Sequence, residues 1–200
     1  MRKETKINLV LVGLFVLIAA GLYTIIFRLG GDSASGRGAG SVIAELNAQR
    51  RVSSNPKPIP GHLAPDFTVQ TMEGGRFALF EQRGKVVLLN FFATWCAPCR
   101  MEVPQLDALN ARFADANFVM LAISSESGLR RVLPQFSSQF RSPPLFAQDA
   151  NNQITGSYRI SGFPETYLID KQGNIARRFI GPYDWNGPEF VALVQRLLDQ

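Results

Sequence analysis

The feature that most constrains this chain is a pair of cysteines three positions apart, Cys96 and Cys99, the only two among its 200 residues. The C-x-x-C motif ends an apolar run, residues 86–92, that predicts a buried strand, and it opens a pattern of helical periodicity. A thiol pair at such a junction is typical of a redox site when the surrounding chain alternates strands and helices. The unpaired N–H groups and the positive dipole end of a helix N-terminus stabilise a thiolate there.

The segments on both sides of the motif predict that alternation. We expect strands at residues 67–71, 76–79, 85–92, 118–124, 145–147, 166–170 and 175–180, and helices at residues 96–113, 129–140, 150–158 and 186–198. The first two strands flank a Gly-Gly turn signal, and Asn186 followed by Glu189 predicts a capping box for the last helix. This order predicts an α/β fold in which helices cover both faces of a mixed central sheet.

The N-terminal segment predicts a membrane anchor. Residues 7–27 carry no charged side chain, and a helix of that length spans roughly 30 Å, the thickness of a bilayer core. Residues 1–6 form a basic tip, which places the N-terminus in the cytoplasm and the rest of the chain across the membrane. A cleaved signal peptide is the competing interpretation, but the apolar run is long for one and lacks a good cleavage site.

Between the anchor and the domain, residues 28–59 are first rich in Gly and Ser and then in Pro, which predicts a flexible linker followed by a stiffer one. The domain itself is expected at residues 60–200. Residues 58–200 carry 13 Lys and Arg against 13 Asp and Glu, so the net charge of +5 lies in the N-terminal part. The sequence therefore indicates no basic surface for nucleic acid.

The predicted compartment bears on the cysteines, because an extracytoplasmic space is oxidising and favours disulfides. A C-x-x-C bridge closes a very small loop, so it constrains the unfolded chain only modestly. A redox role is therefore a better explanation of the pair than a structural crosslink.

With these residues in view, the chain resembles the thioredoxin superfamily. Within it, the chain is similar to the membrane-anchored, TlpA/ResA-like thiol–disulfide oxidoreductases, with the cytochrome c maturation reductases of the CcmG/DsbE type as near neighbours. The resemblance covers residues 60–200. It rests on A-P-D-F at residues 64–67, L-N-F-F-A-T-W-C-A-P-C-R at 89–100 and G-F-P-E-T-Y-L-I-D at 162–170.

The resemblance implies a role for each residue of the site. Cys96 is the expected nucleophile and Cys99 the resolving thiol, and the two form the redox-active disulfide. Pro164 matches the family's cis-proline, which lies beside the disulfide and exposes backbone to a substrate strand. Phe163 and Trp95 are then expected to border the substrate groove.

Two further positions concern the handling of protons. Asn90 occupies the strand position at which ordinary thioredoxins carry a buried acid, and an amide cannot take a proton from the resolving thiol. Glu102 lies one helical turn beyond Cys99 and matches a glutamate that ResA-like proteins use in active-site acid–base chemistry. The alternative for Glu102 is a solvent-facing residue favoured in a first turn by the helix dipole.

The same resemblance implies partners and a location. The substrate is expected to be a protein disulfide, such as the haem-binding cysteines of apocytochrome c or the cysteines of copper-site assembly. A membrane electron donor of the CcdA or DsbD type is expected to resupply electrons, and no cofactor is expected. The domain then lies in the periplasm or its equivalent, tethered to the cytoplasmic membrane by residues 7–27.

Other functions fit the sequence less well. A zinc site needs three or four protein ligands, and two cysteines with His62 cannot supply them. A c-type haem attachment needs C-x-x-C-H, but Arg100 stands in the place of the histidine. Copper carriers of the Sco type have a different cysteine spacing. Peroxiredoxins share the A-P-D-F opening, but Ala93 occupies the place of their Thr or Ser. A thiol peroxidase and a thiol-binding assembly module without turnover remain as alternatives.

Overall fold

The computed structural model describes residues 58–200. The expected cytoplasmic tip, the membrane anchor at residues 7–27 and nearly all of the linker lie outside the described residues. Within residues 58–200, none of the helices combines the length and the apolar character that a bilayer crossing requires.

A mixed sheet of five strands forms the centre of the domain. The order across the sheet is β5 (Leu145–Gln148), β4 (Phe118–Ser124), β3 (Val86–Phe91), β6 (Glu165–Ile169) and β7 (Ile175–Ile180). β3 pairs in parallel with β4 and antiparallel with β6, and β4 pairs in parallel with β5. The predicted mixed sheet is confirmed, and every expected strand occurs within one residue of its expected bounds.

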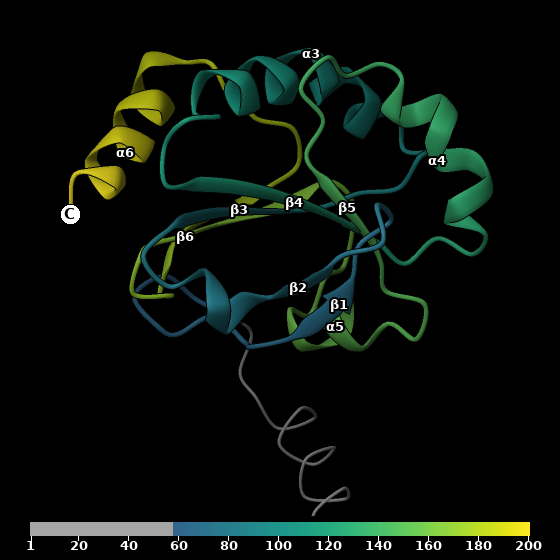
Figure 1. Cartoon of the computed structure of the whole chain (residues 1–200), viewed down its shortest axis with the longest axis horizontal. Coiled ribbons are helices and arrows are strands. Elements are labelled where there is room, and N and C mark those ends of the chain that lie inside the picture. The colour runs from purple at the N-terminus through teal and green to yellow at the C-terminus, as the bar shows by residue number, and fades with distance from the viewer. Residues whose placement is uncertain (1–57) are drawn as a thin grey trace, which may run out of the picture. The chain divides into compact units, whose positions relative to one another are not determined.

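Helices cover one face of this sheet, and a hairpin with shorter helices covers the other (Figure 1). The first layer contains α3 (Ala97–Arg112), α4 (Leu129–Ser137) and α6 (Pro188–Leu198), and the second contains β1 (Thr68–Gln70), β2 (Arg76–Ala78), the 3-10 helix η1 (Leu79–Gln82) and α5 (Gln153–Ser157). Successive side chains of a strand point to opposite faces, so Leu88 packs into the core under the three helices and Leu89 into the core under the hairpin. All six residues of β3 are buried, as the apolar run predicts.

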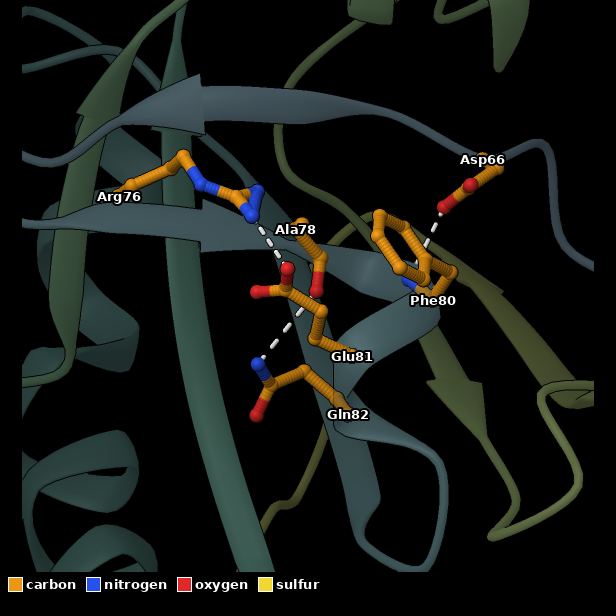
Figure 2. Close-up of polar contacts among 6 residues, drawn as sticks. All are labelled: Asp66, Arg76, Ala78, Phe80, Glu81 and Gln82. Atoms are coloured by element: carbon orange, nitrogen blue, oxygen red, sulfur yellow. Dashed lines mark hydrogen bonds and ion pairs between the residues drawn. The ribbon is translucent and has the colours of Figure 1, made fainter.

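The junction of β2 and η1 differs from the expected strand at residues 76–79, because the chain turns into η1 at Leu79. Figure 2 shows the polar contacts at this junction. The Asp66 carboxylate accepts a hydrogen bond of 3.0 Å from the backbone N–H of Phe80, and Arg76 forms an ion pair with Glu81. These contacts stabilise η1, so Leu79 begins this helix and is not the last residue of β2.

Three helix ends also differ from expectation. α5 begins at Gln153 rather than at residue 150. α4 ends at Ser137 rather than at residue 140, and residues 139 and 140 continue as turns whose N–H groups bond to carbonyls three residues back. The capping box predicted for the last helix is wrong. α6 begins at Pro188 with Gly187 as its N-cap, and the Asn186 side chain instead donates to the carbonyl of Gln105 at 3.3 Å.

Candidate active site

The two cysteines lie where β3 gives way to α3. Cys96 is the N-cap residue of α3, and its Sγ accepts a hydrogen bond of 3.2 Å from the backbone N–H of Cys99. The two form a disulfide with an S–S distance of 2.10 Å and a Cα–Cα distance of 5.3 Å. The buried strand ends where it does because the chain turns at residues 93–96, with the Cys96 N–H donating to the Ala93 carbonyl at 3.1 Å. The sulfur of Cys96 thus lies at the positive end of the α3 dipole.

An open groove of about 460 Å³ adjoins the disulfide. Its lining comes from the start of α3 and from the segment before β6: Trp95, Cys96, Ala97, Pro98, Ile160, Ser161, Gly162 and Phe163. Both cysteines are buried and belong to the core under the three helices, but only Cys96 lines the groove. The groove is therefore shaped so that a partner placed in it meets Cys96.

The Phe163–Pro164 peptide bond is cis, as the resemblance implied. The carbonyl of Pro164 accepts a hydrogen bond of 2.9 Å from the N–H of Gly181, which ties this segment to the end of β7. Phe163 and Trp95 form an edge-to-face pair with ring centroids 6.2 Å apart, although the Trp95 side chain stays 68% exposed. An exposed indole held by a neighbouring ring is a large apolar contact surface for a partner.

Glu102 is buried, contrary to the alternative of a solvent-facing residue. Its Oε1 accepts two hydrogen bonds, one of 2.9 Å from the backbone N–H of Tyr183 and one of 2.7 Å from Nε1 of Trp185. Its Oε2 is buried without a partner among the described residues. Burial raises the pKa of the Glu102 carboxyl above its ordinary value, and the hydrogen bonds from Tyr183 and Trp185 partly offset that rise.

Asn90 is buried in β3 opposite Thr166 of β6, and its Nδ2 donates a hydrogen bond of 2.9 Å to the Thr166 hydroxyl. This hydrogen bond joins two uncharged side chains. Because Asn90 is an amide, Glu102 is the buried carboxyl that lies closest to Cys99 in the sequence.

A second buried carboxylate, which the sequence analysis missed, directly follows the cis-proline. Oε1 of Glu165 accepts hydrogen bonds of 2.7 Å from the Tyr167 hydroxyl and of 2.7 Å from Nε of Arg178 on β7. Burial, followed by the hydrogen bond to Glu165 and its charge, raises the pKa of Tyr167, so the phenol stays protonated and donates. The alternation of Glu165 and Tyr167 along β6 was a visible signal, but the partner Arg178 depends on the register of β6 and β7.

No three His, Cys, Asp or Glu side chains within residues 58–200 lie close enough together to hold a metal ion. The site brings together the two cysteines and the buried carboxyl of Glu102. A disulfide at a helix N-terminus, open on one sulfur to a groove, is suited to thiol–disulfide exchange.

The chain is similar to several known proteins. The AhpC/TSA family matches residues 60–178. The thiol-disulfide oxidoreductase ResA of Bacillus cereus is 32% identical over 124 residues, which cover 60% of this chain and 69% of that protein. The thioredoxin-like protein YneN of Bacillus subtilis is 35% identical over 127 residues, covering 60% of this chain and 71% of that protein.

Among solved structures, a thiol:disulfide interchange protein of the thioredoxin family from Chlorobium tepidum superposes with a TM-score of 0.59 at 27% identity. The match covers 72% of this chain and 99% of that one. The fold is therefore thioredoxin-like, and the disulfide of Cys96 and Cys99 has the place expected of a redox pair. The chain belongs to the AhpC/TSA family, and within that thioredoxin-like group it is a ResA-like thiol–disulfide oxidoreductase.

Proposed function

We propose that the protein is an extracytoplasmic reductase of protein disulfides, with Cys96 as the nucleophile and Cys99 as the resolving thiol. The observation that carries this assignment is the asymmetry of the pair: Cys96 caps α3 and lines the groove, and Cys99 does not. The helix N-terminus stabilises the thiolate of whichever sulfur caps it.

The exchange proceeds in two steps. The Cys96 thiolate attacks one sulfur of the partner's disulfide, forming a mixed disulfide and releasing the partner's other sulfur as a thiolate. The Cys99 thiolate then attacks the Cys96 sulfur, closes the Cys96–Cys99 disulfide and releases the second partner thiolate. Two electrons pass to the partner, and the two protons lost by the cysteines are balanced by those taken up by its thiols.

Glu102 is the group we assign to the proton of Cys99. It lies one turn further along α3, and its buried Oε2 has no partner in the described, oxidised domain. A carboxyl whose pKa is raised by burial holds and releases a proton closer to neutral pH than an exposed one does. Asn90, bonded to Thr166, cannot take this part.

The groove favours a polypeptide as the substrate. Trp95 and Phe163 give it apolar walls, and residues 160–163, which lead into cis-Pro164, form part of its lining. An extended segment that carries a disulfide fits such a surface better than a small polar oxidant does.

For the direction of electron flow, the partners and the location, our proposal draws on the relatives and on the expected anchor. We propose that a membrane donor of the CcdA or DsbD type reduces the pair, and that the targets are apocytochrome c haem-binding cysteines or copper-site assembly cysteines. This proposal rests on the similarity to ResA proteins and on the apolar residues 7–27.

Trapping tests the assignment. In Cys99→Ser the mixed disulfide on Cys96 cannot be resolved, so it should accumulate with its partner, and Cys96→Ser should trap none. Cys96→Ala should abolish reduction of a protein disulfide such as insulin. If Cys96→Ala instead preserves the protein's function, the chain is a binding module and the proposal is wrong. Turnover of hydrogen peroxide faster than of insulin would indicate a thiol peroxidase instead.

A further inference from the structure

A carboxylate from another strand holds the turn that leads into Cys96. The Thr94 backbone N–H donates a hydrogen bond of 2.9 Å to Oε2 of Glu126, and the Thr94 hydroxyl lies 2.9 Å from each oxygen of the same carboxylate. Thr94 is the second residue of the turn that the hydrogen bond from Cys96 to Ala93 closes. Hydrogen bonds to an ionised acceptor are stronger than those between neutral groups.

Glu126 is itself fixed by the ends of two strands. It lies two residues beyond the end of β4, and its N–H donates to the Ser124 hydroxyl at 3.2 Å. Its carbonyl accepts a hydrogen bond of 3.0 Å from Nε2 of Gln148, the last residue of β5. The Glu126 backbone is therefore anchored to the sheet on both sides, and its side chain reaches from there to the turn.

We infer that Glu126 is a positioning residue for the exchange reaction, acting through Thr94 on Trp95 and Cys96. The inference rests on the assignment of Cys96 as the nucleophile. Thr94 immediately precedes the exposed Trp95 and stands two residues before Cys96, so the carboxylate sets how both enter the groove. In-line attack of one sulfur on another is sensitive to placement, because small misalignments of reacting groups carry large rate penalties.

Glu126 acts by accepting hydrogen bonds from Thr94, and not by its charge alone. Without the carboxylate, the Thr94 N–H loses the only acceptor that the described residues give it. The turn then keeps its closing bond from Cys96 to Ala93 and the bond of the preceding Phe92 N–H to Ile123 on β4, but residues 93–96 lose their own hydrogen bonds to the segment after β4. Trp95 should become more mobile, and Cys96 should spend less time in the attacking geometry.

The test compares variants of the full-length protein in the rate constant for reduction of insulin. Glu126→Ala should lower it about tenfold, the effect of losing roughly one charged hydrogen bond in the transition state. Thr94→Val should lower the rate constant less, because the backbone N–H still bonds to Glu126. Thr94→Ser keeps the hydroxyl and should have the wild-type rate constant. The double variant Glu126→Ala/Thr94→Val should be no slower than Glu126→Ala alone. Ser127→Ala, at the exposed neighbour of Glu126, serves as the matched control and should leave the rate unchanged.

A second measurement separates positioning from loss of folding. Acrylamide quenches exposed indoles, and of the two tryptophans Trp95 is 68% exposed and Trp185 is fully buried. Fluorescence anisotropy of the quenchable component therefore reports on Trp95, and it should fall in Glu126→Ala while the far-UV spectrum stays native. If Glu126→Ala does not fold, Glu126→Gln and Thr94→Val carry the test, because each keeps part of the bonding.

Rates within twofold of wild type in folded Glu126→Ala, or single-variant effects that multiply in the double variant, would overturn the inference. The two proposals also fail differently. Insulin reduction that survives Cys96→Ser contradicts the proposed function itself. Loss of activity in Cys96→Ser together with full activity in Glu126→Ala contradicts only the role of Glu126.

Discussion

At the scale of single residues, Glu102 is the side chain whose surroundings conflict most with its charge. It is 3% exposed, and only one of its two oxygens has hydrogen-bond partners. Its identity and its spacing from Cys99 were predictable from the sequence. Its burial was not, because Tyr183 and Trp185 approach it from more than 80 residues further along the chain.

This burial predicts how stability changes with pH. The folded-state pKa of Glu102 is raised above its ordinary value of 4.5, so the folded protein binds the proton more tightly than the unfolded chain does. The Glu102 carboxyl therefore stabilises the folded protein below pH 4.5, and this contribution is lost as the pH rises through its raised pKa. In urea unfolding of the oxidised protein, the free energy of unfolding of Glu102→Gln should increase relative to that of wild type as the pH rises from 4 to 8.

The disulfide must stay closed in that experiment, so that the cysteines do not titrate. Asp107→Asn, on the same helix α3, is the matched control for removal of a carboxylate. A difference between wild type and Glu102→Gln that stays constant with pH would show that the Glu102 carboxyl titrates normally.

Trp185 provides a second test of the same site. Its Nε1 donates to Oε1 of Glu102 and so lowers the pKa of that carboxyl. Trp185→Phe removes this donor while keeping an aromatic ring, and it should raise the pKa of Glu102 further. Carboxyl carbon NMR of the oxidised protein measures this directly. Trp95→Phe should leave the Glu102 resonance unchanged, and an unchanged titration in Trp185→Phe would remove Trp185 from the site.

At the scale of elements, the ion pair of Glu165 with Arg178 joins β6 to the edge strand β7. The Glu165 side chain is 1% exposed and the Arg178 side chain 18% exposed, so the pair is largely removed from water. Together with the bond from Gly181 to Pro164, it ties the segment that lines the groove to β7. This tie helps to explain how a short loop between α5 and β6 keeps a defined groove wall.

Breaking this pair should cost much more than an ordinary surface substitution. Arg178→Met leaves a buried carboxylate with one donor fewer, and the expected loss is about 3–5 kcal/mol of unfolding free energy. Arg177→Met, at an exposed position of the same strand, should cost about 1 kcal/mol or less. Chemical denaturation checks both. Equal losses in the two variants would contradict a buried ion pair, and recovery in Arg178→Met/Glu165→Gln would support it.

The elements themselves were largely predictable. Apolar runs and helical spacing identified β3, β4, β7 and α3 closely, because these elements are buried on regular faces. The start of η1 and the N-terminus of α6 were not, because tertiary contacts decide them: Asp66 bonds to Phe80 from another segment, and Asn186 bonds to Gln105 on α3. Local patterns carry no information about such partners.

At the scale of the whole molecule, the family could be read from three short motifs, whereas the two networks around the site could not. The contacts of Glu126 with Thr94 and of Glu165 with Arg178 span 32 and 13 residues and require the strand order of the sheet. The sequence therefore identified Cys96, Cys99 and Glu102, whereas the contacts of Glu126 and Glu165 depend on the fold.

The anchor is tested on the full-length protein. Residues 7–27 should retain it in the membrane fraction after carbonate extraction, because about 20 apolar residues suffice to span a bilayer. Val16→Arg/Leu17→Arg places two charges in the centre of that run and should release the protein from the membrane. Recovery of the intact wild-type chain in the soluble fraction would contradict the anchor.

The reduction potential of the Cys96–Cys99 pair tests the central claim most directly. Equilibration of the full-length protein with dithiothreitol or glutathione redox buffers, followed by alkylation of free thiols, gives the value. A reductase should be poised below about −200 mV, closer to thioredoxin than to an oxidising periplasmic protein such as DsbA. A potential near −120 mV would mean that the pair accepts electrons from its partners, and it would reverse the proposed direction of the reaction.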